Sequence, residues 1–583
     1  MSGLDIAITA LYFGVMLVIG VVHARRASGS MRSYYLGDNR SSWWMLAASG
    51  AASNFDVSGT MFLVSLFYIV GFHAFWMLWS WGFFNAAFLM AYMAVWIRRT
   101  GVMTAVELMS VRFGDERGGR MARTAGAILM VTFLVFSIGY AYAGLSKFLP
   151  VMLPGIGPGG GQLIALGVMA VTTLYVTLGG FSSVVVADVI QLVMSSSAGL
   201  AVGVIVFLKL DPHLVTVLHA KLSTDLMPHM RMTFPAGYES WDSFGYLCIY
   251  WVLSGLMLNM SGAGGHYGEQ RFLATRSDVD AAKAGAAWGL FLLPRWAMTV
   301  GFVFIAATGL VGASDPEQIL PIVIVKMVPA GLRGLIIAAL FAAFMSSFSS
   351  TVNAAASMVV RDLIEPARPD LSAKTLIRLS YGVTVLLVAV GVGIGLHAES
   401  IKSIWVWMIA GVIGATLIPN VLRWHWWRFN GWGYAWGVFA GLGTTAMFGG
   451  GQALGWFGVA GLAEYQYAPV IWASTLLGAV AGSLLTAPTP DDTLRIFYER
   501  VRPFGAWGPI RALSSPAVLP ARGLIALNVI LGIAILLCCN MSVFFVIGHY
   551  SALAAATLSA AAVCAVVLYF TWYKRLPHEP ATR

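Results

Sequence analysis

The sequence predicts an all-α polytopic membrane protein with about 15 transmembrane helices. Hydrophobic residues make up 59% of the 583 residues and charged residues only 10%, whereas a soluble domain has about 25% charged residues. The mean hydropathy is +0.80. Apolar runs close to the roughly 20 residues that span a bilayer as a helix recur along the chain, without the period-two alternation of a membrane barrel. The four cysteines lie inside such runs and show no disulfide or metal-binding spacing.

Fifteen apolar runs are candidates for membrane-spanning helices. Basic residues concentrate after the odd-numbered runs, as at Arg25-Arg26 and Arg98-Arg99, and the longer loop with Lys221 and Arg231 is the exception. Because Lys and Arg accumulate in cytoplasmic loops, this parity predicts a multi-pass protein of the cell membrane with its N-terminus outside and its C-terminus cytoplasmic. The predicted spans are 3–24, 43–69, 72–97, 124–153, 159–179, 186–210, 244–264, 282–311, 332–361, 377–396, 403–424, 433–451, 466–487, 521–547 and 550–573.

Two of these spans are interrupted by small and polar residues. The second contains Asn54, Asp56 and the Ser58-Gly59 pair at its middle, and the seventh is broken at residues 261–265. Gly-interrupted helices at matching places in two halves are typical of an inverted repeat with its site at the midplane. We therefore predict a five-plus-five core with two broken helices. The predicted parts are an N-terminal helix and loop (1–42), a first repeat (43–210), an extracellular loop (211–243), a second repeat (244–430) and additional helices (431–583).

Residues 334–362 form the run around which the predicted site is organised. Ser346 and Ser347 lie one turn beyond Ala343, because residues three and four apart share a helix face. Small and hydroxyl side chains at such positions either admit a neighbouring helix closely or offer hard oxygen ligands to a small cation. A broken helix frees backbone carbonyls that can coordinate the same cation. The two features together are what a sodium site needs.

Ionisable residues inside the predicted spans are costly and are functional hypotheses by default. Asp56, beside the first break, either caps the second half-helix or binds a cation or a substrate amine. Arg295 follows Pro294 in the middle of the eighth span, and because Arg keeps its proton it must find an anion, carbonyls or water. Its guanidinium either binds a solute carboxylate bidentately or forms a structural pair with an acid such as Asp56 or Asp188.

Five stretches, in the right order, resemble the sodium–solute symporter family, which includes the sodium/glucose and sodium/proline carriers. The resemblance covers about residues 1–430. Each motif is modest by itself, and the order of all five is what makes the resemblance specific. The five stretches are SNFDVSG, GVMTAVELMSVRFGDER, LGGFSSVVVADVIQ, QRFLATRS and AALFAAFMSSFSSTVNAAASMVVRD.

The resemblance implies a sodium site between the broken second span and the ninth span. Matching Ala-Ser-Asn places the second span's carbonyl ligands on Ala52 and Phe55, and matching Asp-x-Ser-Gly would place them on Asn54 and Val57; we favour the first register. Asp188 matches a family aspartate near the inner exit of the ion, and Asp56 is the second residue of the predicted ion path. The predicted ligands are therefore Ala52, Phe55, Ala343, Ser346 and Ser347.

The family's sugar-binding residues are missing from this chain. Where sugar carriers have an Asn, a Lys and a Gln, the corresponding positions here are Gly265, Phe291 and Trp407, and their Glu in the third span has no acidic counterpart. Trp407 would close the cavity with an aromatic wall, and Arg295 lies one turn beyond the Lys position. The predicted substrate residues are Asn54, Thr60, Gly265, Arg295 and Trp407.

The resulting prediction is sodium-coupled symport of a small organic solute into the cell, with a carboxylate-bearing or amino-acid-like solute favoured over a monosaccharide. Sodium is the expected coupling ion, and the expected partners are the solute and the lipid bilayer. The net charge of +10 follows the topology and does not indicate nucleic-acid binding. No enzyme motif is present. A sodium-linked membrane sensor or leak channel is the alternative from another class, and the oligomeric state is left open.

Overall fold

The computed structural model is built from helices. It describes residues 2–24, 41–53, 56–80, 83–102, 107–153, 155–176, 181–222, 224–234, 238–262, 269–312, 314–455, 461–516 and 521–577. Within these ranges the only β-type pairing is an isolated bridge between Trp426 and Ala506. The predicted all-α class is therefore confirmed.

The first part of the chain extends to the loop before residue 244, and its described residues form twelve main helical elements. They are α1 (Gly3–Ala24), α3 (Trp43–Ser53), α4 (Val57–Val70), α5 (Ala74–Met77), α6 (Asn85–Phe88), η3 (Leu89–Met93), α7 (Ala94–Arg99), α8 (Glu107–Phe113), α9 (Arg117–Met152), α10 (Gly157–Val176), α11 (Phe181–Lys209) and α12 (Pro212–Lys221).

The second part of the chain continues with α13 and ends with a pair of long helices. Its elements are α13 (Phe244–Met260), α14 (Glu269–Leu273), α15 (Asp278–Phe291), α16 (Leu293–Ala307), η6 (Pro316–Gln318), α17 (Ile319–Met327), α18 (Leu332–Met358), η7 (Val359–Ile364), α19 (Glu365–Ala367), α20 (Ala373–His397), α21 (Ile401–Val406), η8 (Trp407–Ile413), α22 (Gly414–His425), α23 (Gly431–Ala453), α24 (Glu464–Leu485), α25 (Asp491–Val501), α26 (Gly508–Leu513), α27 (Arg522–Ile547) and α28 (Ser551–Thr571).

Each of the fifteen predicted ranges coincides with a helix or with consecutive helices. Among the described residues, 9 helical stretches are long and apolar enough to cross a membrane, and α13 together with parts of α1, α10 and α18 forms shorter apolar helices. The prediction of many apolar spanning helices is thus confirmed at this coarser level. The count of fifteen crossings and the inverted repeat stay predictions.

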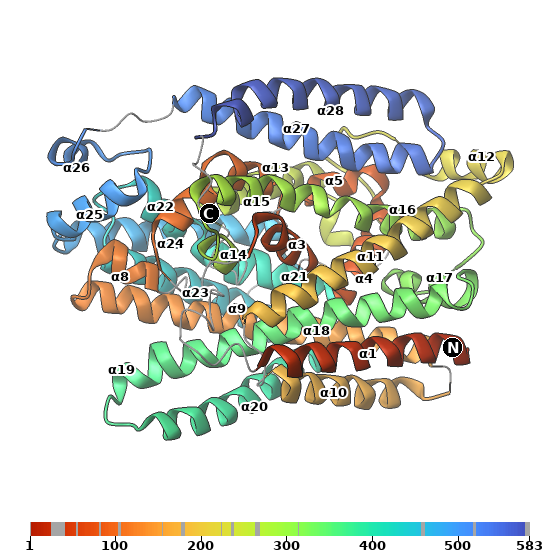
Figure 1. The fold of residues 1–583 in the computed structure, drawn as a ribbon, viewed down its shortest axis with the longest axis horizontal. Coiled ribbons are helices and arrows are strands. Elements are labelled where there is room, and N and C mark those ends of the chain that lie inside the picture. Colours follow the sequence, from red (N-terminus) through yellow and green to blue (C-terminus); the bar gives the residue numbers. More distant parts are fainter. Residues whose placement is uncertain are drawn as a thin grey trace.

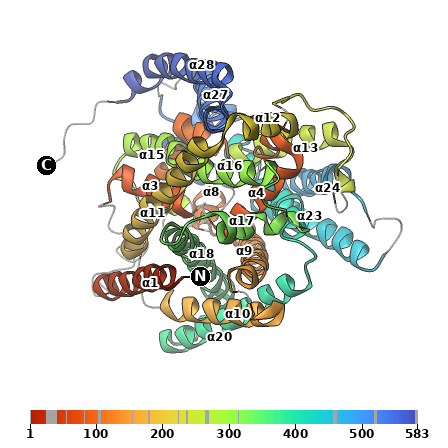
Figure 2. The same cartoon turned by 90° about the vertical axis from the view of Figure 1, so that its right-hand side faces the viewer.

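The long helices run in roughly the same direction, along the long axis of the molecule (Figure 1). The hairpin of α27 and α28 forms one flank, and α1, α10 and α20 lie along the opposite flank (Figure 2). Between these flanks, α9 packs against α4, α18 and α23, and α11 packs against α3, α16 and α18. The centre of the bundle is therefore formed by helices from both halves of the chain.

Both predicted interruptions are present. α3 ends at Ser53 and α4 begins at Val57, where the side chain of Asp56 accepts a hydrogen bond from the Gly59 amide at 2.6 Å. α13 ends at Met260, and Gly262 follows with a φ of 82°, a left-handed conformation that favours glycine. The Asp56 cap thus begins α4 after the first interruption, and the turn at Gly262 follows the end of α13 at the second.

The loops predicted to be cytoplasmic gather at one end of the molecule. α8, α19, α25 and α26 lie at the left end of Figure 1, whereas the N-terminus, α12 and α17 lie at the right end. This common end contains the stretches after spans 3, 9 and 13, where the sequence is rich in arginine. The arrangement agrees with the parity of the spans, and the orientation of these ends in the membrane stays a prediction.

Candidate functional site

A cavity of about 250 Å³ lies between α4, α6, α9, α15, α16, α18 and the α21–η8 segment. Its wall is mainly apolar with a few polar groups, which is the usual make-up of a small-molecule site. The volume is slightly below the ~300 Å³ at which drug-sized sites begin, so it suits a small solute. The polar lining residues are Ser53, Asp56, Ser58, Ser80, Asn85, Ser137, Tyr140, Arg295, Ser347 and Thr351.

Arg295 reaches this cavity from the start of α16. Its Nη2 donates to Thr60 Oγ1 at 3.5 Å, and Thr60 Oγ1 in turn donates to the Asp56 carbonyl at 2.6 Å. The Asp56 carboxylate caps α4 and also lines the cavity, where it interacts electrostatically with Arg295. Thr60 is fully buried behind this pair and is not part of the cavity wall. The structure therefore joins Asp56, Thr60 and Arg295 in one polar group.

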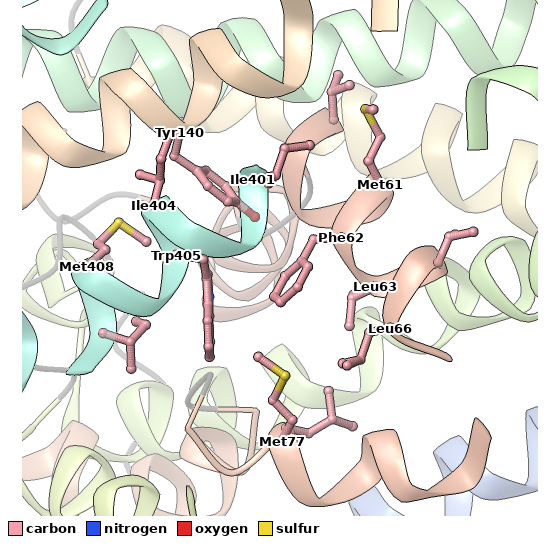
Figure 3. Packing of buried hydrophobic residues seen from close by; sticks show 14 of the residues in the cluster. Met61, Phe62, Leu63, Leu66, Met77, Tyr140, Ile401, Ile404, Trp405 and Met408 are labelled. Carbon is pink, nitrogen blue, oxygen red and sulfur yellow. The ribbon is translucent and has the colours of Figure 1, made fainter. Parts of the chain in front are cut away.

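Trp405, and not Trp407, is the tryptophan of the α21–η8 segment that lines the cavity. Trp405 lines the cavity and packs on Phe62 at 5.4 Å between ring centroids (Figure 3). Trp407 instead stacks on Tyr467 of α24, at 5.2 Å with 12° between the ring planes, and is absent from the lining. Two positions along a helix are separated by about 200°, so these two tryptophans face nearly opposite sides. The expected role of Trp407 was wrong for this reason.

The hydroxyl pair of α18 lies against the C-terminal end of α3. Ser347 Oγ donates to the Ser53 carbonyl at 3.1 Å, and Ser346 Oγ donates to Asp188 Oδ1 at 2.5 Å. Each hydroxyl thus gives its hydrogen to a protein acceptor, and the oxygen of a hydroxyl also has lone pairs of the kind that bind a cation. Ala52 and Ala343 are buried on the same two helices. Of the other predicted residues, Asn54, Phe55 and Gly265 lie outside the described residues.

Asp188 of α11 is the centre of a buried network that joins four helices. Its carboxylate accepts from Ser346, from Ser49 at 2.6 Å and from Arg271 Nη2 at 3.2 Å. Arg271 Nε also donates to Ser49 Oγ at 2.9 Å. The side chains of Asp188 and Arg271 are only 1% and 3% exposed. Asp188 therefore links α18, which carries the proposed sodium ligands, to α3 and α14.

Arg271 and Tyr140 are the site residues that the sequence prediction missed. Arg271 lies in the QRFLATRS stretch, which we used as a motif of the family resemblance without assigning a role to this arginine. The Tyr140 hydroxyl and Asn85 Oδ1, both on the cavity lining, are buried and accept or donate no hydrogen bond within the described part of the chain. Buried polar atoms without partners usually indicate a ligand or water.

A second buried ion network lies at the other end of α21. Glu317, 2% exposed, accepts from Lys147 Nζ at 2.5 Å and from the amides of Ile401 and Lys402 at 3.1 and 3.0 Å. Lys147 also pairs with Asp315 at 3.0 Å. Because an anion is stabilised by the free amides of a helix N-terminus, Glu317 fixes the start of the helix that carries Trp405.

The comparisons with known proteins agree with this arrangement. The family model described as "Sodium:solute symporter family" matches residues 34–441, which is well over half of the chain. The chain belongs to the sodium:solute symporter family. Its coupling ion is sodium, and its activity is sodium-coupled symport across a membrane. The recognition of the family from five short stretches is therefore confirmed.

Curated relatives of this symporter are identical to it at about a quarter of the aligned residues. The sodium/mannose cotransporter SLC5A10 of Bos taurus is 26% identical over 76% of this chain and 78% of its own length. The sodium/glucose cotransporter 4 of Danio rerio is 25% identical over 84% and 80%, and the sodium/sialic acid symporter NanT of Aliivibrio fischeri is 26% identical over 65% and 74%. These transporters are named for three different solutes.

One solved structure shows the same fold. A substrate-bound, outward-open sodium-coupled sialic acid symporter aligns with a TM-score of 0.64 at 19% identity, over 84% of this chain and 99% of that chain. The likeness extends beyond the family model, because it includes more of the chain than residues 34–441. It supports the transporter fold of the symporter and leaves the solute to the chemistry of the cavity.

Proposed function

We propose that this symporter couples sodium entry to the uptake of a small solute that bears a carboxylate, and that Arg295 binds this carboxylate. The observation that carries the proposal is the position of Arg295 on the wall of the central cavity. The planar guanidinium presents paired N–H donors that match the two oxygens of a carboxylate. Amino acids and sugar acids of a size that fits about 250 Å³ are the solute classes that follow.

The balance of charge supports a carboxylate together with sodium. Asp56 and Arg295 have opposite charges on the cavity wall, so the protein part of the site is close to neutral. A sodium ion and a solute carboxylate then neutralise each other as well. Because an uncompensated charge inside a membrane is costly, this combination favours occlusion of the loaded site.

In this proposal the sodium ion holds α3 and α18 together. The ligands are the predicted carbonyls of Ala52 and Phe55 and the oxygens of Ala343, Ser346 and Ser347. Asp188 lies directly behind Ser346 and provides the next anionic group toward Arg271. Sodium would pass along this route as α14 separates from α11 during alternating access, and Asp56 would lie at the cavity end of the same path.

The charge balance determines the driving force. With one sodium and one monoanion per cycle no net charge moves, so a tenfold sodium gradient, worth ~1.4 kcal/mol, sustains about tenfold accumulation. With a neutral solute, a potential of about 100 mV adds ~2.3 kcal/mol, and the sum sustains roughly 500-fold accumulation. Transport of a monocarboxylate should therefore be insensitive to membrane potential.

Arg295→Lys tests the proposal because it keeps the positive charge and removes the paired N–H donors of the guanidinium. Charge-assisted hydrogen bonds contribute about 1.5–3 kcal/mol each, so we expect the affinity for a carboxylate solute to fall by roughly 10- to 100-fold while sodium binding persists. Thermal-shift screens of sugar acids, amino acids and neutral sugars, with and without sodium, measure both affinities. Arg123→Lys is the matched control, because Arg123 pairs with Asp362 away from the cavity. A neutral sugar that stabilises the protein in sodium, equally in Arg295→Lys, would overturn the proposal.

A neutral monosaccharide or polyol is the second candidate. It is favoured by the unpaired hydroxyl of Tyr140 and Oδ1 of Asn85 on the cavity wall, and by relatives named for mannose, glucose and myo-inositol. In that case each cycle moves positive charge, and Tyr140→Phe should weaken solute binding more than Arg295→Lys does. Currents recorded from proteoliposomes on a solid-supported membrane distinguish a neutral sugar, which gives a current, from a monoanionic acid, which gives none. A zwitterionic amino acid also gives a current, and its loss of affinity in Arg295→Lys distinguishes it from a sugar.

A sodium sensor or leak channel differs from both candidates in its sodium flux. A leak would carry sodium without solute, and a sensor would bind the solute without moving it. The closely packed hydroxyl pair on α18 favours a site that closes around its ion. Sodium uptake by proteoliposomes should therefore depend on added solute.

A further inference from the structure

A second cavity, of about 280 Å³, opens on the flank formed by the C-terminal hairpin. We call it the hairpin groove. It lies between α6, η3, α15, α27 and α28, which pack against one another. Figure 2 shows α15, α27 and α28 on one side of the bundle. Its lining residues are Ala86, Ala87, Met90, Ala286, Leu290, Gly532, Ile535, Leu536, Ala565, Leu568, Tyr569, Trp572 and Tyr573.

The hairpin groove faces outward along the apolar flank of the molecule. Leu290 is 44% exposed and Tyr569 is 47% exposed, whereas the sides of the groove are made of small residues such as Ala286, Gly532 and Ala565. At its end the Trp572 indole donates to the Met90 carbonyl at 3.1 Å, which attaches the last turn of α28 to η3. The groove is therefore an apolar slot with small residues in its wall, and lipid chains would contact it when α27 and α28 lie in a bilayer.

One lysine side chain lies against a residue of the hairpin groove, and two further basic residues follow at the end of α28. Lys283 Nζ lies over the ring of Tyr573, 6.0 Å from its centroid, and Tyr573 is itself a groove residue. Lys574 and Arg575 follow at the exposed end of α28. The nearby acid Asp278 is already paired with Arg98 and Arg99. The apolar slot thus ends in positive charge at the membrane surface that contains the C-terminal end of α28.

We propose that the hairpin groove binds one anionic phospholipid, with an acyl chain in the slot and the phosphate beside Lys283, Lys574 and Arg575. Basic pockets between membrane helices recognise anionic headgroups, and an apolar slot of this shape suits a hydrocarbon chain. Charge complementarity selects this occupant over a zwitterionic lipid, because the phosphate of an anionic lipid has no compensating choline. Ala86 lines both the hairpin groove and the central cavity, so the bound lipid would lie one residue layer from the transport site.

Native mass spectrometry of the full chain, released from nanodiscs of equal parts phosphatidylglycerol and phosphatidylcholine, tests the proposal. We expect one retained phosphatidylglycerol per chain. Each basic residue near the surface contributes about fivefold to the binding of an anionic lipid, so Lys283→Gln, Lys574→Gln and Arg575→Gln together should abolish the preference for phosphatidylglycerol. Equal retention of both lipids by the unchanged protein would overturn the proposal.

Ala565→Trp provides a second test, because it fills the slot from the exposed face of α28 and leaves the charges in place. It should remove the retained lipid. Ala560→Trp is the matched control, since Ala560 is exposed on the same helix and does not line the groove; it should retain the lipid. Retention of phosphatidylglycerol by Ala565→Trp, with an elution volume like that of the unchanged protein, would also refute the site.

Discussion

Ser346 and Ser347 are adjacent in sequence, yet their hydroxyls point to different acceptors. One donates to a carboxylate on α11 and the other to a carbonyl at the end of α3. This division lets the pair connect α18 to both helices, and in the proposed site the same two oxygens would bind one sodium ion. Packing and sodium binding are therefore compatible roles for these residues, and they must be separated by experiment.

Removal of both hydroxyls, in Ser346→Ala with Ser347→Ala, should raise the sodium concentration needed for half-maximal uptake by about tenfold or more, because each charge-assisted contact contributes roughly 1.5–3 kcal/mol. Uptake measured against sodium concentration gives this value. Ser65→Ala with Ser254→Ala is the control, since it removes two buried hydroxyls that donate to carbonyls of their own helices. An unchanged sodium dependence would leave packing as the role of the pair.

Asp188 and Arg271 should behave as a unit. Asp188→Asn leaves the buried Arg271 uncompensated, and breaking a buried pair costs about 3–5 kcal/mol. We expect a lower unfolding temperature of the purified protein and a turnover that falls more than solute affinity does. In Asp188→Asn with Arg271→Gln the unfolding temperature should recover in part while turnover stays low. Equal losses of affinity and turnover in Asp188→Asn would argue against a role in ion release.

At the scale of elements, the start of α21 controls the shape of the cavity. Glu317 accepts from the amides of Ile401 and Lys402 and so positions the first turn of α21. Four residues later the same segment presents Trp405 to Phe62 (Figure 3). A change in the ion network around Glu317 should therefore shift the position of Trp405 on the cavity wall.

Glu317→Gln should destabilise the protein by about 3 kcal/mol, because it removes the buried partner of Lys147, and it should raise the solute KM. Thermal unfolding and uptake kinetics measure the two effects. Asp315→Asn is the matched control: Asp315 also pairs with Lys147 but is 35% exposed, so its loss should cost at most about 1 kcal/mol. Equal effects of the two substitutions would show that α21 is not held by Glu317.

At the scale of the whole molecule, the arginine-rich loops share one end (Figure 1). We expect this end to be cytoplasmic. A single cysteine that reacts with a thiol reagent can report on which side of the membrane this end lies. Glu116 is exposed and suits such a cysteine, whereas a side chain added at the nearby Gly118 would crowd the ring of Trp432, 3.1 Å from its Cβ. The exposed His213, at the opposite end, is the matching position on the other side.

Single cysteines at Glu116 and at Thr582, in a background without native cysteines, should resist an impermeant thiol reagent in intact cells. A cysteine at His213 should react. Labelling after permeabilisation controls for accessibility. Reaction of Glu116→Cys and Thr582→Cys from outside, with protection of His213→Cys, would invert the proposed orientation.

Much of the fold could be predicted because the relevant signals are local. Apolar run lengths indicated where helices lie, and Asp56 with its neighbouring Ser58-Gly59 indicated the break at which α4 begins. The family followed from five motifs that each occupy a few residues. These properties depend on burial in a bilayer and on backbone conformation, which the chain expresses over one or two turns.

The partners within the site could not be predicted in the same way. Asp188 meets Arg271, 83 positions away in the chain, whereas the sequence left open whether Arg295 would pair with Asp56 or with Asp188. Trp405 faces the cavity and Trp407 faces Tyr467, which depends on how the α21–η8 segment is rotated. Composition, helix placement, helix breaks and family membership were thus determined by the sequence itself, because they are local. The ion pairs and the cavity wall were decided only by tertiary structure, because helix rotation and long-range packing set which side chains meet.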